Sequence, residues 1–113
     1  METIAEMPEF IKQAERLLAA DERLTLINYL AEFPLADVVM QGTGGIRKLR
    51  WAREGIGKSG GVRVIYYYHD GRMPLYLLTM FGKNEKANLS AAERNALAKL
   101  VRLLVLASGL KDG

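Results

Sequence analysis

The sequence contains no cysteine and only one histidine among its 113 residues. The absence of cysteine excludes disulfides, a thiol nucleophile, cysteine-ligated zinc and iron–sulfur clusters. His69 has no partners at metal-ligand spacing and no support for a Ser-His-Asp triad, so neither a metal site nor a cofactor is predicted. Any chemistry must therefore depend on lysine, arginine, tyrosine and groups of the substrate.

Long apolar runs are also missing. Charged residues interrupt the first thirty positions, and no segment approaches the roughly 18 apolar residues of a membrane span. We therefore expect no export signal, no membrane anchor and a cytoplasmic location. The hydrophobic content of 50% and the charged content of 26% are typical of a folded chain. The length suits a single domain spanning residues 1–113.

Positive charge is concentrated in the middle of the chain. Residues 46–86 contain nine lysines and arginines against three acids, a net charge of +6, whereas the whole chain carries +3. A positive segment favours a polyanion, because each neutralised phosphate releases counterions. The alternative is a solvated face of a sheet.

The apolar periodicity predicts helices at the two ends and strands between them. Pro8 suits the first position of a helix over residues 8–19, and Asp21 suits the N-cap of a second helix that stops at Pro34. Ser90 and Glu93 form a capping box that begins the last helix. Strands are expected over residues 46–53, 62–69 and 74–81. The fold class is therefore α+β, with two N-terminal helices, an antiparallel sheet of about three to four strands and a C-terminal helix, the helices covering one face of the sheet.

Two local patterns leave alternatives open. The glycine-rich residues 54–61 contain a Gly-Lys-Ser run, but a phosphate-binding loop would need glycine in place of Ala52 and a helix directly afterwards. This segment is expected to be mobile or closely approached by a ligand. The apolar run over residues 103–106 makes the end of the last helix either core or an interface.

The basic side chains of the first two predicted strands form the strongest candidate site. Because alternate side chains share a face, Lys48 and Arg50 project together, while Arg47 and Trp51 take the opposite side. Arg63, early in the next strand, is expected nearby. Such a concentration of cations is relieved by a bound polyanion, unless the side chains splay into solvent at an edge of the sheet.

The order and spacing of several motifs resemble a known family. The sequence is similar to the RelE/ParE superfamily of bacterial toxins from type II toxin–antitoxin modules, most closely its HigB-like branch. The resemblance covers nearly the whole chain and implies a RelE-like microbial ribonuclease-type fold. The motifs that carry it are DVV at 37–39, GTGGIRKLR at 42–50, GKSGGVRVIYY at 57–67, LLT at 77–79, GKNE at 82–85 and the helix start LSAAE at 89–93.

The resemblance implies a ribosome-dependent mRNA endoribonuclease that inhibits translation. It also implies a cognate helix-turn-helix antitoxin as partner, besides mRNA on the ribosome. Such enzymes cut without a metal, since the 2′-hydroxyl of the substrate attacks the adjacent phosphate and leaves a 2′,3′-cyclic phosphate. A ParE-like, non-enzymatic inhibitor of gyrase or of another target is the alternative on the same fold.

The resemblance also implies roles for individual residues. Arg63 matches an arginine that stabilises transition-state charge. Lys48 and Arg50 match basic positions that hold phosphate or abstract the proton, and Lys83 matches the lysine of a Gly-Lys-x-Glu segment. The resemblance assigns no proton donor to the leaving 5′-oxygen, for which Tyr67 and Lys83 are the two candidates. Further candidates for contact with RNA are the basic Arg47 and Lys58 and the aromatic Trp51, Tyr66 and Tyr67, the aromatic ones either stacking on bases or lying in the core.

Overall fold

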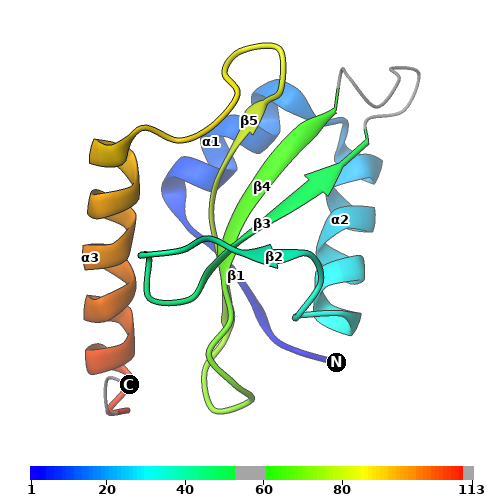
Figure 1. Cartoon of the computed structure of the whole chain (residues 1–113). Coiled ribbons are helices and arrows are strands. Elements are labelled where there is room, and N and C mark those ends of the chain that lie inside the picture. Colours follow the sequence, from blue (N-terminus) through cyan, green and yellow to red (C-terminus); the bar gives the residue numbers. More distant parts are fainter. Residues whose placement is uncertain (53–60, 111–113) are drawn as a thin grey trace.

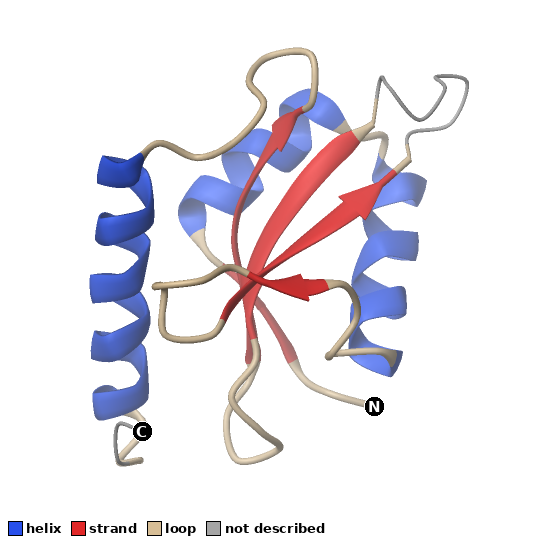
Figure 2. Ribbon diagram, in the orientation of Figure 1, coloured by secondary structure: helices blue, strands red, loops and turns tan. Residues whose placement is uncertain are grey.

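The computed structural model describes residues 1–52 and 61–110. It confirms the α+β class, with two N-terminal helices, a sheet and a C-terminal helix (Figure 1, Figure 2). In chain order the elements are β1 (Ile4–Glu6), α1 (Pro8–Leu17), α2 (Ala20–Glu32), β2 (Val38–Val39), β3 (Ile46–Trp51), β4 (Val62–Tyr67), β5 (Leu75–Gly82) and α3 (Ala91–Ala107).

The helix starts follow the local chemistry of the sequence, with one correction. Pro8 opens α1 as predicted. The capping box of α3 is confirmed, since Ser90 Oγ accepts from the Glu93 N–H at 3.1 Å and Glu93 Oε1 accepts from the Ser90 N–H at 2.9 Å. Asp21 is not the N-cap of α2, because Glu22 Oε1 accepts from the Ala19 N–H at 2.9 Å and the helix begins earlier.

The sheet has five strands in the order β1-β5-β4-β3-β2. The predicted meander of β3, β4 and β5 is antiparallel, as expected, and β2 adds to it antiparallel at one edge. The expectation of an entirely antiparallel sheet is wrong, because β1 pairs with β5 in parallel at the other edge. Both missed strands are very short, three and two residues, and exist only through pairing with a longer neighbour.

Helices cover both faces of the sheet, which corrects the expectation that one face stays free. Helices α1 and α2 pack on the face formed by Leu49, Val64 and Tyr66. Helix α3 packs on the opposite face, where Val101 and Val105 lie in one cluster with Ile65. Figure 1 shows α3 beside the loop that joins β2 to β3, at one side of the sheet. The part of this second face that lies beyond α3 carries the candidate site.

The apolar end of α3 is partly core, as one of the two expectations had it, and partly exposed. Val101 and Val105 are buried against the sheet, whereas Leu103 and Leu106 are 64% and 55% exposed. The same end of the helix therefore contributes to the core and presents apolar side chains to solvent.

The Gly-Thr-Gly-Gly motif forms the tight turn between β2 and β3. Gly42, Gly44 and Gly45 all have positive φ, a conformation that glycine adopts without steric cost. The buried Thr43 hydroxyl donates to the Met40 carbonyl at 2.6 Å and accepts from the Ile46 N–H at 3.1 Å. The motif thus fixes where β3 begins and hence which of its side chains share a face.

Candidate functional site

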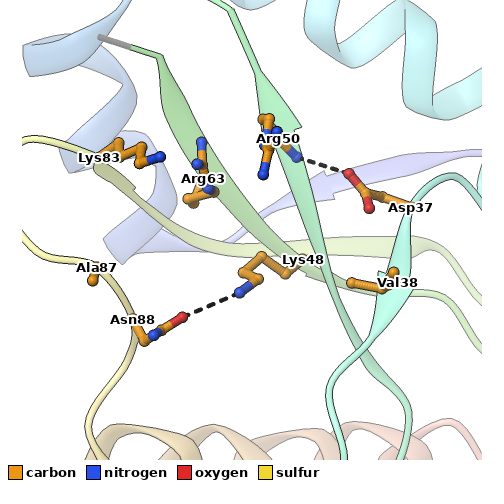
Figure 3. A pocket seen from close by; sticks show the side chains of 8 residues that line it. All are labelled: Asp37, Val38, Lys48, Arg50, Arg63, Lys83, Ala87 and Asn88. Carbon is orange, nitrogen blue, oxygen red and sulfur yellow. Dashed lines mark hydrogen bonds between the residues drawn. The ribbon is translucent and has the colours of Figure 1, made fainter. Parts of the chain in front are cut away.

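An open cavity of about 670 Å³ lies on the second face of the sheet, between β2, β3, β4 and the segment after β5. All four cations predicted to be catalytic line it, so the fold brings together side chains from three separate parts of the sequence. Figure 3 shows these four side chains around one space, with the Lys48 ammonium turned toward Asn88. The lining residues are Asp37, Val38, Lys48, Arg50, Arg63, Lys83, Ala87 and Asn88.

Strand pairing places the cations of β3 and β4 side by side. Arg50 is the direct register partner of Arg63, and Lys48 stands two residues earlier in β3, on the same face as Arg50. The Lys48 ammonium donates to Asn88 Oδ1 at 3.2 Å, which ties the strand to the segment before α3 (Figure 3). This shared face agrees with the alternation predicted from the sequence.

Arg63 is the buried cation of the site. Its side chain is only 6% exposed, and its guanidinium makes a long hydrogen bond of 3.4 Å to the Val62 carbonyl. Burial lowers the pKa of the Arg63 guanidinium, and the charge of Arg50 lowers it further, while Asp37 acts in the opposite direction. Arginine nevertheless stays protonated, so Arg63 presents a desolvated positive charge to the cavity.

A turn at the end of β5 carries Lys83. The Lys83 N–H donates to the Gly61 carbonyl at 3.0 Å, which anchors the turn beside the start of β4. Glu85 Oε1 accepts from the Gly82 N–H at 2.8 Å, and the same carboxylate pairs with Arg16 of α1 at 2.6 Å. Helix α1 therefore fixes, through Glu85, the turn from which the Lys83 ammonium reaches the cavity.

Four of the lining residues were not among the predicted site residues: Asp37, Val38, Ala87 and Asn88. Asp37 is the charged one of these four. Its backbone has φ of 61°, and its Oδ2 accepts from the Arg50 N–H at 3.0 Å. The only signal for it was its membership of the DVV motif. It supplies the one carboxylate among the described residues that line the cavity.

Three predicted contact residues do not line this cavity. Arg47 lies on the opposite face of β3 and donates to the Leu35 and Asp37 carbonyls, each at 3.1 Å. Trp51, on the same face as Arg47, packs against Tyr29 with ring centroids 5.4 Å apart. The hydroxyl of Tyr67 is 3.0 Å from His69 Nδ1.

Two further predicted contact residues remain, the aromatic Tyr66 and the basic Lys58. Tyr66 is fully buried on the face of α1 and α2, and its hydroxyl donates to the Ala36 carbonyl at 2.6 Å. Lys58 lies outside the described residues.

Within residues 1–52 and 61–110, no group of three or more histidines and carboxylates is arranged to hold a metal ion. No helix in this described part of the chain is long and apolar enough to cross a membrane. Among the described residues, the cavity is lined by four positive side chains and one carboxylate, a set suited to an anion.

Comparison with known proteins identifies the family of the chain. A family model described as the RelE toxin of the RelE/RelB toxin–antitoxin system matches residues 8–111, which is nearly the full chain. A member of this family has an antitoxin as its partner. The chain therefore belongs to the RelE toxin family and is the toxin of a toxin–antitoxin system.

Proposed function

We propose that this toxin is a ribosome-dependent mRNA endoribonuclease of the HigB-like branch, and that it inhibits translation by cutting mRNA without a metal. The observation that carries the proposal is the convergence of Lys48, Arg50, Arg63 and Lys83 on one cavity. A cleavage by the 2′-hydroxyl passes through a phosphorane with added negative charge. Preorganised cations aimed at that charge are the main source of stabilisation in such a step.

Each cation has a role that follows from its position. Arg63 is held in place by burial within β4, so its guanidinium suits the charge that develops on the phosphorane. Arg50 and Lys48 are more exposed and suit the binding of the scissile and neighbouring phosphates. Lys83 faces the same space from an exposed turn, and its ammonium is the proton donor we assign to the leaving 5′-oxygen.

Tyr67 is the less favoured donor for the leaving oxygen. Its side chain is 6% exposed and belongs to the core cluster beneath α3, and its hydroxyl already interacts with His69. A substrate phosphate in the cavity would contact the four cations before it reached this phenol.

The test is primer extension on an mRNA in a purified translation system, with and without ribosomes. We expect cuts only with ribosomes present, ending in a 2′,3′-cyclic phosphate, and a loss of about 100-fold or more in Arg63→Ala. The matched control is Arg72→Ala, since Arg72 is an exposed arginine that pairs with Asp70 in the β4–β5 turn, away from the cavity.

Two results would count against the proposal. If the native protein and Arg63→Ala cut mRNA equally well, the protein would still be a nuclease, but the assignment of its active site would be wrong. A folded native protein that cuts no mRNA would favour the non-enzymatic alternative, and inhibition of gyrase supercoiling would then be assayed.

The same cavity is the surface we propose for the antitoxin, because covering it blocks the substrate. An acidic segment of the antitoxin would complement its four cations. Crosslinks from the antitoxin to Lys48 and Lys83 are expected, and crosslinks confined to α1 and α2 would contradict this placement.

A further inference from the structure

The proposed cleavage needs a group that accepts the 2′-hydroxyl proton, and most of the cavity cannot supply one. Arginine and the lysine ammonium are hydrogen-bond donors without an acceptor, and the Lys48 ammonium already donates to Asn88. Val38 and Ala87 are apolar, and an amide such as that of Asn88 is not a base. Among the described residues that line the cavity, the carboxylate of Asp37 is the group able to take up a proton.

The segment that carries Asp37 is held from the opposite face of the sheet. Arg47 donates to the carbonyls of Leu35 and Asp37, and the buried Tyr66 hydroxyl donates to the Ala36 carbonyl. These three bonds hold the backbone on both sides of Ala36. The backbone from which the Asp37 side chain projects is therefore held in place beside the cavity.

The carboxylate itself is fixed by one of its two oxygens. Asp37 Oδ2 accepts from the Arg50 N–H, in the β3 strand that also carries two of the cations (Figure 3). The backbone at φ of 61° is a sparsely populated conformation for a residue other than glycine, although aspartate and asparagine enter it more readily than most. Such outliers cluster at functional sites, where the surrounding contacts hold them.

We propose that Asp37 is the general base of this ribonuclease, an inference that rests on the proposed function. The carboxylate takes the proton of the 2′-hydroxyl as the O2′–P bond forms. The P–O5′ bond then breaks, and the 5′-oxygen leaves with a proton from the Lys83 ammonium. Exchange with water returns the proton from Asp37 to solvent and restores the ammonium, so that no other co-reactant is consumed.

The decisive variant is Asp37→Asn, because asparagine retains an acceptor for the Arg50 N–H and tolerates positive φ but cannot act as a base. We expect its ribosome-dependent cleavage to be slower by about 100-fold or more, the usual contribution of general base catalysis. Its thermal unfolding should match that of the native protein. Glu32→Gln, an exposed carboxylate at the end of α2, makes the same change of charge away from the cavity and should cut at the native rate.

The pH dependence separates a base from a positioning residue. In Asp37→Asn hydroxide must remove the proton, so the cleavage rate should rise in proportion to hydroxide between about pH 7 and about pH 9, while the native rate stays nearly constant. A slow variant with the flat native profile would overturn the inference and leave Asp37 as a positioning residue. Native-like cleavage by Asp37→Asn would overturn it as well, with the proposed function intact.

Two further outcomes are decided by the same experiment. A folded native protein that cuts no mRNA overturns the inference together with the proposed function. If Asp37→Asn fails to fold, Asp37→Gly, which relieves the positive φ, replaces it. Cleavage by the glycine variant that returns with formate, but not with chloride at equal ionic strength, supports the inference, and no return overturns it.

Discussion

Arg50 and Arg63 are direct partners across β3 and β4, although both carry positive charge. Like charges opposite each other destabilise a sheet, and here one of the two side chains is 6% exposed. The pairing is maintained by the hydrophobic residues of both strands, which alternate with the arginines and lie in the core. A phosphate bound between the two guanidinium groups would relieve the repulsion. The unfavourable pairing of the two arginines therefore favours the binding of a polyanion.

Replacing the buried arginine should therefore stabilise the fold and remove the function. For Arg63→Met we expect a free energy of unfolding higher by up to about 1 kcal/mol, because a cross-strand repulsion and a desolvated charge disappear. Urea denaturation at low salt measures this. Inorganic phosphate should raise the unfolding temperature of the native protein more than that of the variant. A less stable variant would show that Arg63 contributes more by packing than it costs by repulsion.

Arg47 should act through the backbone of the 35–37 segment rather than through RNA. Its two hydrogen bonds to carbonyl oxygens predict that Arg47→Ala lowers the free energy of unfolding by about 1–3 kcal/mol. Urea denaturation measures the change in stability, and a filter-binding assay with ribosome-bound mRNA measures the change in RNA affinity. Arg50→Ala is the comparison, and we expect it to lower RNA affinity with little change in stability. If Arg47→Ala instead lowered RNA affinity and left stability unchanged, Arg47 would be a residue that contacts RNA.

The buried Tyr66 should make stability sensitive to alkaline pH. Burial raises the pKa of Tyr66 to about 12, above the value near 10 of an unfolded tyrosine. Its stabilising contribution is therefore complete below about pH 10 and decreases as the pH rises toward about 12. Tyr66→Phe should be less stable than the native protein by about 1 kcal/mol at neutral pH, because the Ala36 carbonyl loses its donor.

The difference between the native protein and Tyr66→Phe should narrow as pH rises above about 10. Urea denaturation across this range provides the measurement. Tyr68, whose pKa is raised to about 12 by its hydrogen bond to Glu2, titrates in both proteins and cancels in the comparison. A difference that is constant with pH would mean that the Tyr66 hydroxyl does not titrate differently in the two states.

The ion pair between Arg16 and Glu85 should affect the position of Lys83, and hence cleavage, more than the stability of the fold. Glu85→Ala removes the acceptor of the Gly82 N–H and the partner of Arg16, so the turn that carries Lys83 loses its anchor. We expect weaker cleavage by this variant. The further loss on adding Lys83→Ala should be smaller than the loss that Lys83→Ala causes alone, because both act on the same group. Additive losses in this double-mutant cycle would separate Glu85 from Lys83.

Local chemistry explains why much of the fold could be predicted from the sequence. Pro8 and the Ser90–Glu93 box act within one turn of their helices, and the alternation of Ile46, Lys48 and Arg50 is a property of any extended strand. Strand β1 could not be foreseen in this way. Three residues have no strand signal of their own, and their conformation comes from hydrogen bonds to β5, which is about seventy residues away in the chain.

The amino-acid sequence by itself determined the α+β class, the basic middle of the chain and the shared face of Lys48 and Arg50, because these depend on composition and on the period of a strand. Only the tertiary structure decided that Arg63 is buried opposite Arg50, that Arg47 turns away to hold the 35–37 segment, and that Asp37 lies among the cations. The reason is that strand register and the path of the chain between β2 and β3 bring together residues whose separation in the sequence carries no sign of their proximity.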